Sequence, residues 1–501
     1  MIRNGKDIAN GTRISTQVCI IGSGPAGVTA AWYLQKAGLR VTLIEGSRPV
    51  TRLDGGAPES WPDKVLLYNG VADGLFATNE TDFLIVPYDG DSGGPWERER
   101  VFGGTSSHWA QCRPLDPITF EKRPGFPGWP ITREELDPYY SAAAQLCHLT
   151  DDFTAAYWAG RLGGKDPGLA GFDTEMYQFL AKPYRNFATR KFDDGKNGKT
   201  IGDSAADVIL NASLLEIDHS AGMVHSLRVA SMNDDKRAPK KLTEFTIQAD
   251  VYVLACGAVG NAHQLLLSNA GNEHDHVGRN FMCHPLTRNH VVHIERDYLN
   301  AREWRLMSGE VGLRPIPFQS DDSVAIQARF SPNAEKQKEL GIGSCWFWPG
   351  SNQYYFEMAP NPQSRVTLAD TLDPVFGQQQ THITWKLTDR DKTTWDQTTR
   401  LFQIAVETHN PSGSVRFDSW DDVKSQLVVN GHHIGTTRMS ANPEDGVVDK
   451  NLKVHSLANL YVAGSSVFPS TGISNPTFTI ITLSIRLAEH LTGVLGKRPT
   501  T

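Results

Sequence analysis

Two histidines stand side by side in the stretch GHHIGTTRM, at His432 and His433. An imidazole with its usual pKa of about 6.5 is largely neutral at neutral pH, and a neutral imidazole can take the proton of a hydroxyl group. If this stretch is extended, successive side chains point to opposite faces, so only one of the two histidines faces a given site. The pattern predicts one acid–base histidine, and strand geometry alone does not say which.

A second group of residues has the spacing of a dinucleotide-binding turn. Gly22, Gly24 and Gly27 form G-x-G-x-x-G between an apolar run and a stretch of helical periodicity, and Glu45 ends the next apolar run. In such a unit the glycines allow a tight turn, close approach of a pyrophosphate and helix–strand packing, while the acid binds ribose hydroxyls. We expect a dinucleotide site that disfavours NADP, because Glu45 would repel a ribose phosphate. These residues leave FAD and NAD both open.

The elements around these motifs indicate a mixed α/β protein. Residues 17–47 have the pattern of a strand–helix–strand unit, residues 205–255 alternate like strands, and residues 475–493 form a helix with an apolar stripe. Thr132–Glu135 has the spacing of a capping box, and Asp137–Pro138 is typical of a second helix start.

Composition argues against several classes of function. The 501 residues carry a net charge of −7, which disfavours nucleic acid as a partner. The six cysteines form no C-x-x-C pair, so neither a metal site nor a disulfide framework is expected. The N-terminus lacks the apolar core of a secretion signal, and we expect no segment with the apolar length of a membrane-spanning helix. These features favour a cytoplasmic protein, and they leave its oligomeric state open.

Further motifs in the chain carry a family resemblance. FGGTSSHW, VYVLACGAVGNAHQLLLS, VGRNFMCHP, HHIGTTRM and SNPTFTIITLSIRLAEHL occur in this order. Together they resemble the glucose–methanol–choline (GMC) oxidoreductase family, nearest in motif to its pyranose-oxidase-like and bacterial sugar- or glycoside-oxidising members. The resemblance implies a Rossmann-like FAD-binding domain and a substrate domain with a large antiparallel sheet and helices. The FAD-binding domain would comprise residues 1–150, 190–286 and 431–501, and the substrate domain with its lid segments residues 151–189 and 287–430.

The resemblance also assigns FAD contacts to residues outside the first glycine turn. His108 matches a histidine that carries FAD covalently in pyranose-oxidase-like members, but Ala110 departs from their pattern. FAD is therefore expected to bind without a covalent bond, with a link at His108 as the alternative. The last helix would direct its positive end at the flavin ring. The implied contacts are Gly103, Gly104, Ser107 and His108 beside the ring, Leu214 at the adenine, Gly464 and Ser465 along the phosphates or ribityl chain, and Pro476 and Thr477 at the start of the last helix.

The match to the family motif distinguishes the two histidines. It places the catalytic base at His432 and its partner at Asn475, which leaves His433 a structural role. The implied reaction is oxidation of an alcohol to a carbonyl by hydride transfer to flavin N5, on a sugar or glycoside. A primary alcohol of an aminoglycoside-type or other secondary metabolite is the alternative, and a non-redox FAD-containing lyase is a further one. The electron acceptor, oxygen or another molecule, stays open. Four tryptophans could stack on sugar rings: Trp304, Trp346, Trp348 and Trp385.

Overall fold

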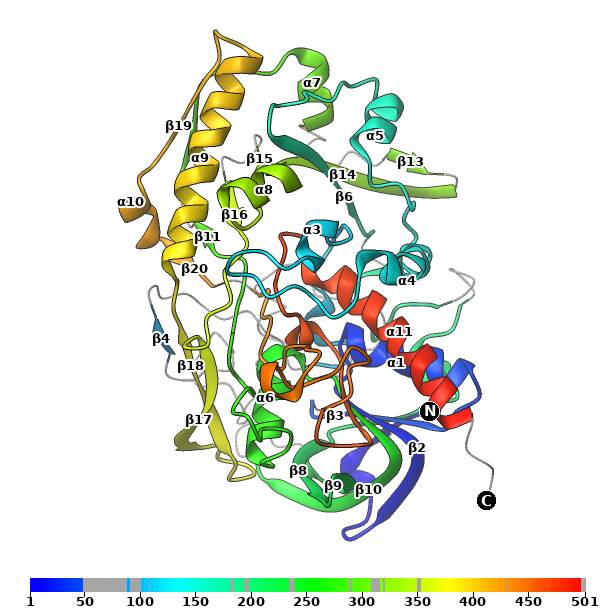
Figure 1. The fold of residues 1–501 in the computed structure, drawn as a ribbon. Helices are drawn as coiled ribbons and strands as arrows, with labels where there is room; N and C mark the ends of the chain where they lie inside the picture. The colour runs from blue at the N-terminus through cyan, green and yellow to red at the C-terminus, as the bar shows by residue number, and fades with distance from the viewer. Residues whose placement is uncertain are drawn as a thin grey trace.

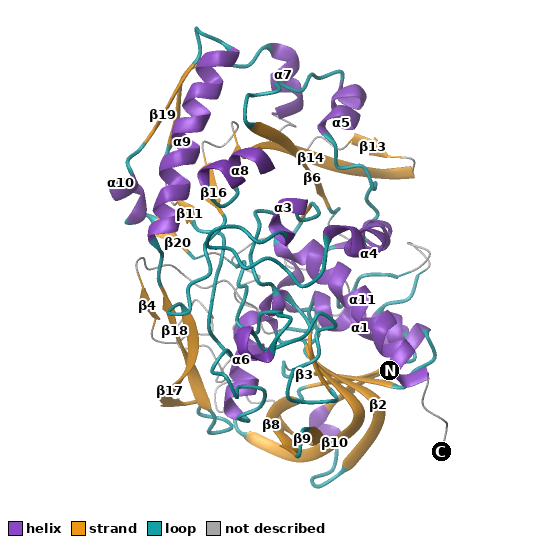
Figure 2. Ribbon diagram, in the orientation of Figure 1, coloured by secondary structure: helices purple, strands orange, loops and turns teal. Residues whose placement is uncertain are grey.

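The chain forms two large β-sheets, one toward each end of the molecule, with helix α11 between them (Figures 1 and 2). The computed structural model describes residues 1–47, 88–90, 101–107, 109–181, 184–192, 198–233, 239–287, 291–307, 316–318, 320–348, 353–429 and 431–496. The mixed α/β class predicted from the sequence is confirmed.

The first sheet is built around the predicted strand–helix–strand unit. Its central strands pair in parallel, whereas β9 pairs with β10 and β8 in antiparallel fashion. Strand β3 is buried along its whole length, which explains its continuous apolar sequence. The strand order is β1 (Ile2–Asn4), β7 (Asp207–Leu210), β3 (Val41–Glu45), β2 (Arg13–Ile21), β10 (Lys241–Leu254), β9 (Met223–Met232) and β8 (Ser213–Ser220), and β21 (Leu460–Val462) also pairs with β10.

The second sheet is the large antiparallel sheet that the resemblance implies. Its order is β20 (Leu427–Val428), β11 (Leu286–Thr287), β16 (Gln353–Phe356), β15 (Cys345–Trp348), β14 (Ser320–Pro332), β6 (Phe172–Phe179) and β5 (Gln111–Cys112), and β13 (Ile316–Phe318) also pairs with β14. Two smaller sheets accompany it: β17 (Arg365–Leu372), β18 (Gln379–Trp385) and β4 (Tyr88–Gly90), and β12 (Val292–Arg296) with β19 (Ser414–Phe417).

Strand β5 shows how closely the two halves of the chain are joined. The expected division places residues 111–112 with the FAD-binding domain, but they pair with β6 in the second sheet. The division into domains itself stays a prediction.

The helices cover the sheets and fill the space between them. Their bounds are α1 (Pro25–Lys36), α3 (Pro117–Phe120), α4 (Arg133–Leu146), α5 (Ala155–Leu162), α6 (Gly257–Leu267), α7 (Ala301–Met307), α8 (Ala334–Leu340), α9 (Asp389–His409), α10 (Trp420–Lys424) and α11 (Pro476–Gly496). Two expectations need correction. Pro138 lies inside α4, which starts at the Thr132 capping box, so Asp137–Pro138 begins no second helix. Helix α11 is long and apolar enough to cross a membrane, contrary to expectation, but most of it is buried between α1, α4 and the rest of the core.

Candidate active site

One large cavity collects most of the predicted site residues. Its volume is about 590 Å³, and residues from both large sheets line it. The predicted residues in its wall are Gly22, Gly24, Glu45, Gly104, Leu214, His432, Gly464, Ser465, Asn475, Pro476 and Thr477.

Two of the three motif glycines are required by the protein's own backbone. Gly22 has a φ of +103°, and a Cβ there would lie 2.5 Å from the carbonyl oxygen of Ala255. A Cβ at Gly27, in the first turn of α1, would lie 1.9 Å from the carbonyl oxygen of Gly22. Gly22 therefore makes the turn, and Gly27 allows the helix to pack against the strand.

Gly24 has a different reason to be glycine. Its backbone is extended, with φ −69° and ψ −176°, a conformation that any residue adopts. A Cβ at Gly24 would meet no atom of the described residues within 4 Å, and Gly24 lines the cavity. The glycine therefore keeps space free for a ligand rather than for the fold. This cradle fits the pyrophosphate of the expected FAD, beside the free N–H groups at the start of α1.

Glu45 at the end of β3 joins the two glycine turns through a serine. Its Oε2 accepts hydrogen bonds from the N–H (3.2 Å) and Oγ–H (2.6 Å) of Ser23, and its Oε1 accepts one from the N–H of Ser47 (2.9 Å). The Ser23 Oγ in turn accepts from the N–H of Gly103 at 3.1 Å. The sequence reasoning missed Ser23, although a hydroxyl residue between the first two motif glycines was a visible signal.

The Gly103–Gly104 turn lies directly against the first glycine turn. Gly103 and Gly104 have φ values of +95° and +59°, and a Cβ at Gly104 would lie 3.0 Å from the Cα of Gly24. Gly104 lines the cavity, whereas Gly103 does not. Ser107 ends the short 3₁₀ turn that follows. The side chain of Ser107 and the whole of His108 lie outside the described residues, so the covalent alternative at His108 stays a prediction.

The remaining predicted FAD contacts come from three separate elements. Leu214 lies on β8, Gly464 follows β21 with a φ of +113°, and Pro476 and Thr477 form the first turn of α11. All four line the cavity, so the positive end of the α11 dipole faces it.

Ser465 connects the FAD-contact segment after β21 with the histidine segment. Its Oγ–H donates to the carbonyl oxygen of His433 at 2.6 Å, and its own carbonyl accepts from the N–H of Gly435 at 3.2 Å. Ser465 thus fixes the backbone on which His432 and His433 stand, besides lining the cavity.

His432 and Asn475 lie next to each other in the cavity wall. The Asn475 Nδ2 is 3.1 Å from the His432 Nε2, although 43 residues separate the two in sequence. His432 is half-buried, whereas His433 is 7% exposed and its ring centroid lies 5.4 Å from that of Phe281. In the part of the chain that the structure describes, residues 431–433 belong to no strand. The two histidines therefore differ through their packing rather than through strand alternation.

A third histidine, His284, contacts His432 and was not anticipated as a site residue. Its Nδ1 lies 2.9 Å from the His432 Nδ1, and its Nε2 donates to the carbonyl oxygen of Gly472 at 3.0 Å. His284 is only 1% exposed. A gap of 148 residues separates it from His432, so its partner could not be read from local pattern. The sequence signal was a histidine directly after the apolar residues of NFMCHP.

The surroundings keep both imidazoles neutral at neutral pH. Burial lowers the pKa of His284 to about 4. Burial lowers the pKa of His432 well below its usual 6.5, and positive charge on His284, His433 or the Arg329 guanidinium lowers it further. A neutral imidazole has one nitrogen with a free lone pair, which is the form that accepts a proton.

The second sheet gives the cavity an aromatic wall. Trp346 on β15 and Tyr355 on β16 are cross-strand partners, and their stacked rings have centroids 4.2 Å apart. The guanidinium of Arg329 lies 3.8 Å from the Trp346 ring centroid and 4.0 Å from that of Tyr177. Trp346 thus already has stacking partners within the protein.

Two of the four tryptophans that could stack on a sugar ring lie away from the cavity wall. Trp346 and Trp348 line the cavity, but Trp304 and Trp385 do not. Trp385 is fully buried, and Trp304 on α7 donates its indole N–H to Asp297.

Arg329 also orients an amide group at the cavity. It is 1% exposed, and its Nη2 donates to the Oε1 atoms of Gln111 and Gln327. Because Gln111 accepts through Oε1, its Nε2 remains as a donor, and this half-buried side chain lines the cavity. Among the described residues of the cavity wall, Glu45 is the only carboxylate.

Comparison with known proteins agrees with these observations. Models of the GMC oxidoreductase family match residues 199–286 and 360–484, and an FAD dependent oxidoreductase model matches residues 17–52. A long-chain-alcohol oxidase of Arabidopsis thaliana is 22% identical over 99% of this chain and 72% of its own length. A 6'''-hydroxyparomomycin C oxidase of Streptomyces lividus is 24% identical over 98% of this chain and 94% of its own. The crystal structure of pyridoxine 4-oxidase from Mesorbium loti shares the fold, with a TM-score of 0.56 at 17% identity over 95% of this chain and 99% of that one.

The sequence resemblance, the cavity and these comparisons lead to one assignment. A dinucleotide cradle and a neutral histidine line the same cavity. The two GMC models cover His284 and the segment that contains His432 and Asn475, and the FAD dependent oxidoreductase model covers the first glycine turn. The chain therefore belongs to the GMC oxidoreductase family, and it is an FAD-dependent oxidoreductase.

Proposed function

We propose that this enzyme oxidises a hydroxyl group of a neutral sugar or glycoside, with His432 as the base. FAD, when bound, supplies the hydride acceptor. The Nε2 of His432 takes the hydroxyl proton, and the side-chain amide of Asn475 donates a hydrogen bond to the same oxygen and orients it. The observation that carries the proposal is the 3.1 Å approach of Asn475 Nδ2 to His432 Nε2 in the cavity wall.

The chemistry of the opposite wall supports a substrate with several hydroxyl groups. The Gln111 Nε2 can donate to an oxygen other than the reacting one, and Tyr355 adds a half-buried aromatic side chain. A cationic amino sugar would meet no carboxylate there, because Glu45 belongs to the wall that fits the dinucleotide. A neutral sugar is therefore favoured over an aminoglycoside, although one relative is named for a paromomycin-type substrate.

The test is anaerobic flavin reduction in matched histidine variants. His432→Ala should retain FAD and reduce the flavin about 10²- to 10⁴-fold more slowly with substrate, since that is the usual contribution of a general base. His433→Ala should keep most of the rate. The reverse ranking of the two variants would show that the base is assigned to the wrong histidine.

The choice of substrate is a separate arm of the same experiment. The holoenzyme is mixed without air with simple glycosides, aminoglycosides and straight-chain alcohols, and loss of the flavin absorbance is followed. Faster bleaching by glycosides supports the proposal. Faster bleaching by aminoglycosides or by long-chain alcohols would show that the substrate belongs to that class instead. Turnover of a substrate without any bleaching would indicate a non-redox lyase.

A further inference from the structure

The hydrogen bonds around His284 determine which nitrogen of His432 carries its proton. A carbonyl oxygen has no hydrogen to donate, so the bond from His284 to Gly472 places a hydrogen on the His284 Nε2. A neutral imidazole carries one N–H, which leaves the His284 Nδ1 as an acceptor. The 2.9 Å contact between the two Nδ1 atoms then requires the hydrogen on the His432 Nδ1.

The consequence for His432 is a lone pair at Nε2. This is the nitrogen that lies 3.1 Å from Asn475 Nδ2, on the side of the amide that can donate. In the opposite tautomer, the His432 Nε2–H would face the Asn475 N–H₂ group, and the two Nδ1 atoms would meet as two acceptors. Both contacts would be lost, so the arrangement favours one tautomer strongly.

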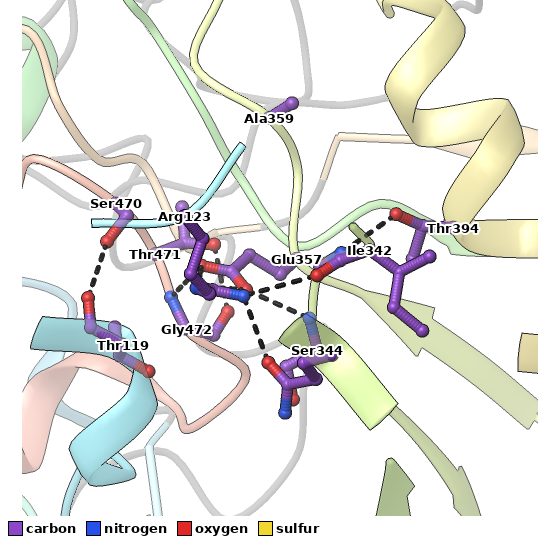
Figure 3. Close-up of polar contacts among 12 residues, drawn as sticks. Thr119, Arg123, Ile342, Ser344, Glu357, Ala359, Thr394, Ser470, Thr471 and Gly472 are labelled. Carbon is purple, nitrogen blue, oxygen red and sulfur yellow. Dashed lines mark hydrogen bonds and ion pairs between the residues drawn. The ribbon is translucent and has the colours of Figure 1, made fainter. Parts of the chain in front are cut away.

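The residue that supplies this carbonyl, Gly472, is itself held in place. The N–H of Gly472 donates to the Glu357 Oε1 at 3.0 Å, and both carboxylate oxygens of Glu357 accept from the Arg123 Nη2 at 3.0 Å (Figure 3). The Arg123 and Glu357 side chains are 2% and 0% exposed. Gly472 has a φ of +55°, and a Cβ there would lie 2.8 Å from the Thr119 Oγ1.

The buried ion pair is in turn held by the second sheet and its connections. The Glu357 Oε2 accepts from the N–H of Ser344 at 2.9 Å (Figure 3). The Arg123 Nη1 donates to the Gln337 Oε1 at 2.9 Å. These bonds fix the peptide group between Thr471 and Gly472, and the Gly472 carbonyl oxygen also accepts from the Thr471 Oγ–H at 2.9 Å, so it stays directed at His284.

We propose that His284 is a positioning residue that selects the Nδ1–H tautomer of His432, and so presents the basic Nε2 to the substrate. The proposal rests on the proposed role of His432 as the base. The charged and titratable groups that act on His432 besides His284 are His433 and Arg329. Arg329 does not explain the tautomer, because an arginine is a donor only, and the partner that lies 2.9 Å from the His432 Nδ1 is the His284 Nδ1.

Two substitutions at position 284 separate the positioning role from a structural one. In His284→Asn, the side-chain oxygen can take the place of Nδ1 and accept from His432, but the bond to Gly472 is lost. In His284→Gln, the amide reaches the place of Nε2 and donates to Gly472, but His432 loses its acceptor. We expect His284→Gln to lower kcat about 100-fold with KM changed less than threefold. The kcat of His284→Asn should be at least about 10-fold higher than that of His284→Gln.

A matched surface variant controls for the loss of a histidine. His293→Asn removes a histidine that pairs with Asp418 on the outer strand β12, with 35% of its side chain exposed, and it should keep the wild-type rate. Equal losses in His284→Asn and His284→Gln would overturn the proposal, since a purely structural role does not distinguish the acceptor from the donor.

The tautomer can also be read without turnover. In holoenzyme labelled with ¹⁵N-histidine, long-range proton–nitrogen spectra should show a protonated Nδ1 and an unprotonated Nε2 for the signal that is lost in His432→Ala. His284→Gln should shift this signal toward a mixture of tautomers, and His284→Asn should not. A protonated Nε2 in the wild type would overturn the inference. This result differs from failure of the proposed function, which would appear as full activity of His432→Ala.

Discussion

The wall of the cavity that fits a dinucleotide is made mainly of backbone, whereas the wall near the histidines is made of side chains. On the first, Gly22, Gly24 and Gly104 bring main-chain atoms to the cavity within two turns that touch each other. On the second, Trp346 and Tyr355 come from two strands, and His432 comes from a distant segment. Substitutions in the first wall should therefore act by filling the space of the ligand, whereas substitutions in the second wall should act by removing hydrogen bonds.

The largest expected effect comes from filling the backbone wall. Gly24→Val adds a side chain where the described part of the chain has no atom within 4 Å of the new Cβ and where the backbone is already extended. The chain should fold, but it should lose bound FAD, because the new methyl groups occupy the space of the pyrophosphate. The measurement is the FAD-to-protein absorbance ratio after purification, together with circular dichroism to verify folding.

The control for this variant is the same substitution in open space. A Cβ at Gly160 on α5 also has no neighbour within 4 Å in the part of the chain that the structure describes, but Gly160 lies outside the cavity wall. Gly160→Val should keep its FAD. Full FAD content in Gly24→Val would mean that the cofactor's phosphates lie elsewhere.

The same contrast explains what could be predicted from the sequence. Gly22, Gly27 and Glu45 lie within one strand–helix–strand unit, where local spacing determines geometry, and their placement follows from the motif. His284 acts through a residue 148 positions away, and no periodicity encodes that distance. His432 and Asn475 were named only because the family register supplied their pairing.

The interior behind the side-chain wall gives the next largest effect. Glu357→Gln would leave the Arg123 guanidinium buried without a counter-charge, and losing one partner of such a pair costs about 3–5 kcal/mol. We expect the urea concentration at the midpoint of unfolding of the holoenzyme to fall accordingly. Tryptophan fluorescence would be used to follow the unfolding. Glu216→Gln removes a partner of Arg228 at the surface, where both side chains are about half exposed, and should cost less than about 1 kcal/mol. Similar midpoints for the two variants would contradict the importance of the buried pair.

A substitution of Gln111 in the side-chain wall should have a smaller effect, and it should lower kcat/KM for polar substrates more than for apolar ones. Gln111→Met keeps the approximate volume but removes the donor that Arg329 orients toward the cavity. The kcat/KM for a glycoside should fall about 10-fold, which corresponds to one lost hydrogen bond of about 1.4 kcal/mol. The kcat/KM for a straight-chain alcohol should stay within about twofold. Equal losses for both substrates would indicate that Gln111 supports the site only through packing.

The smallest expected effect is that of pH on the rate of flavin reduction. The direction of this effect follows from the burial of His432. His432 must be neutral to act as the base, so the rate is lost only when pH falls through its pKa. Burial, reinforced by the positive charge of Arg329, holds that pKa well below 6.5. The rate of anaerobic flavin reduction should therefore change less than about twofold between pH 8 and pH 6.5, and it should decline only at lower pH. A half-maximal rate near pH 6.5 would instead show that water reaches His432 as freely as it reaches an exposed histidine, and the side-chain wall would then be more open than its contacts indicate.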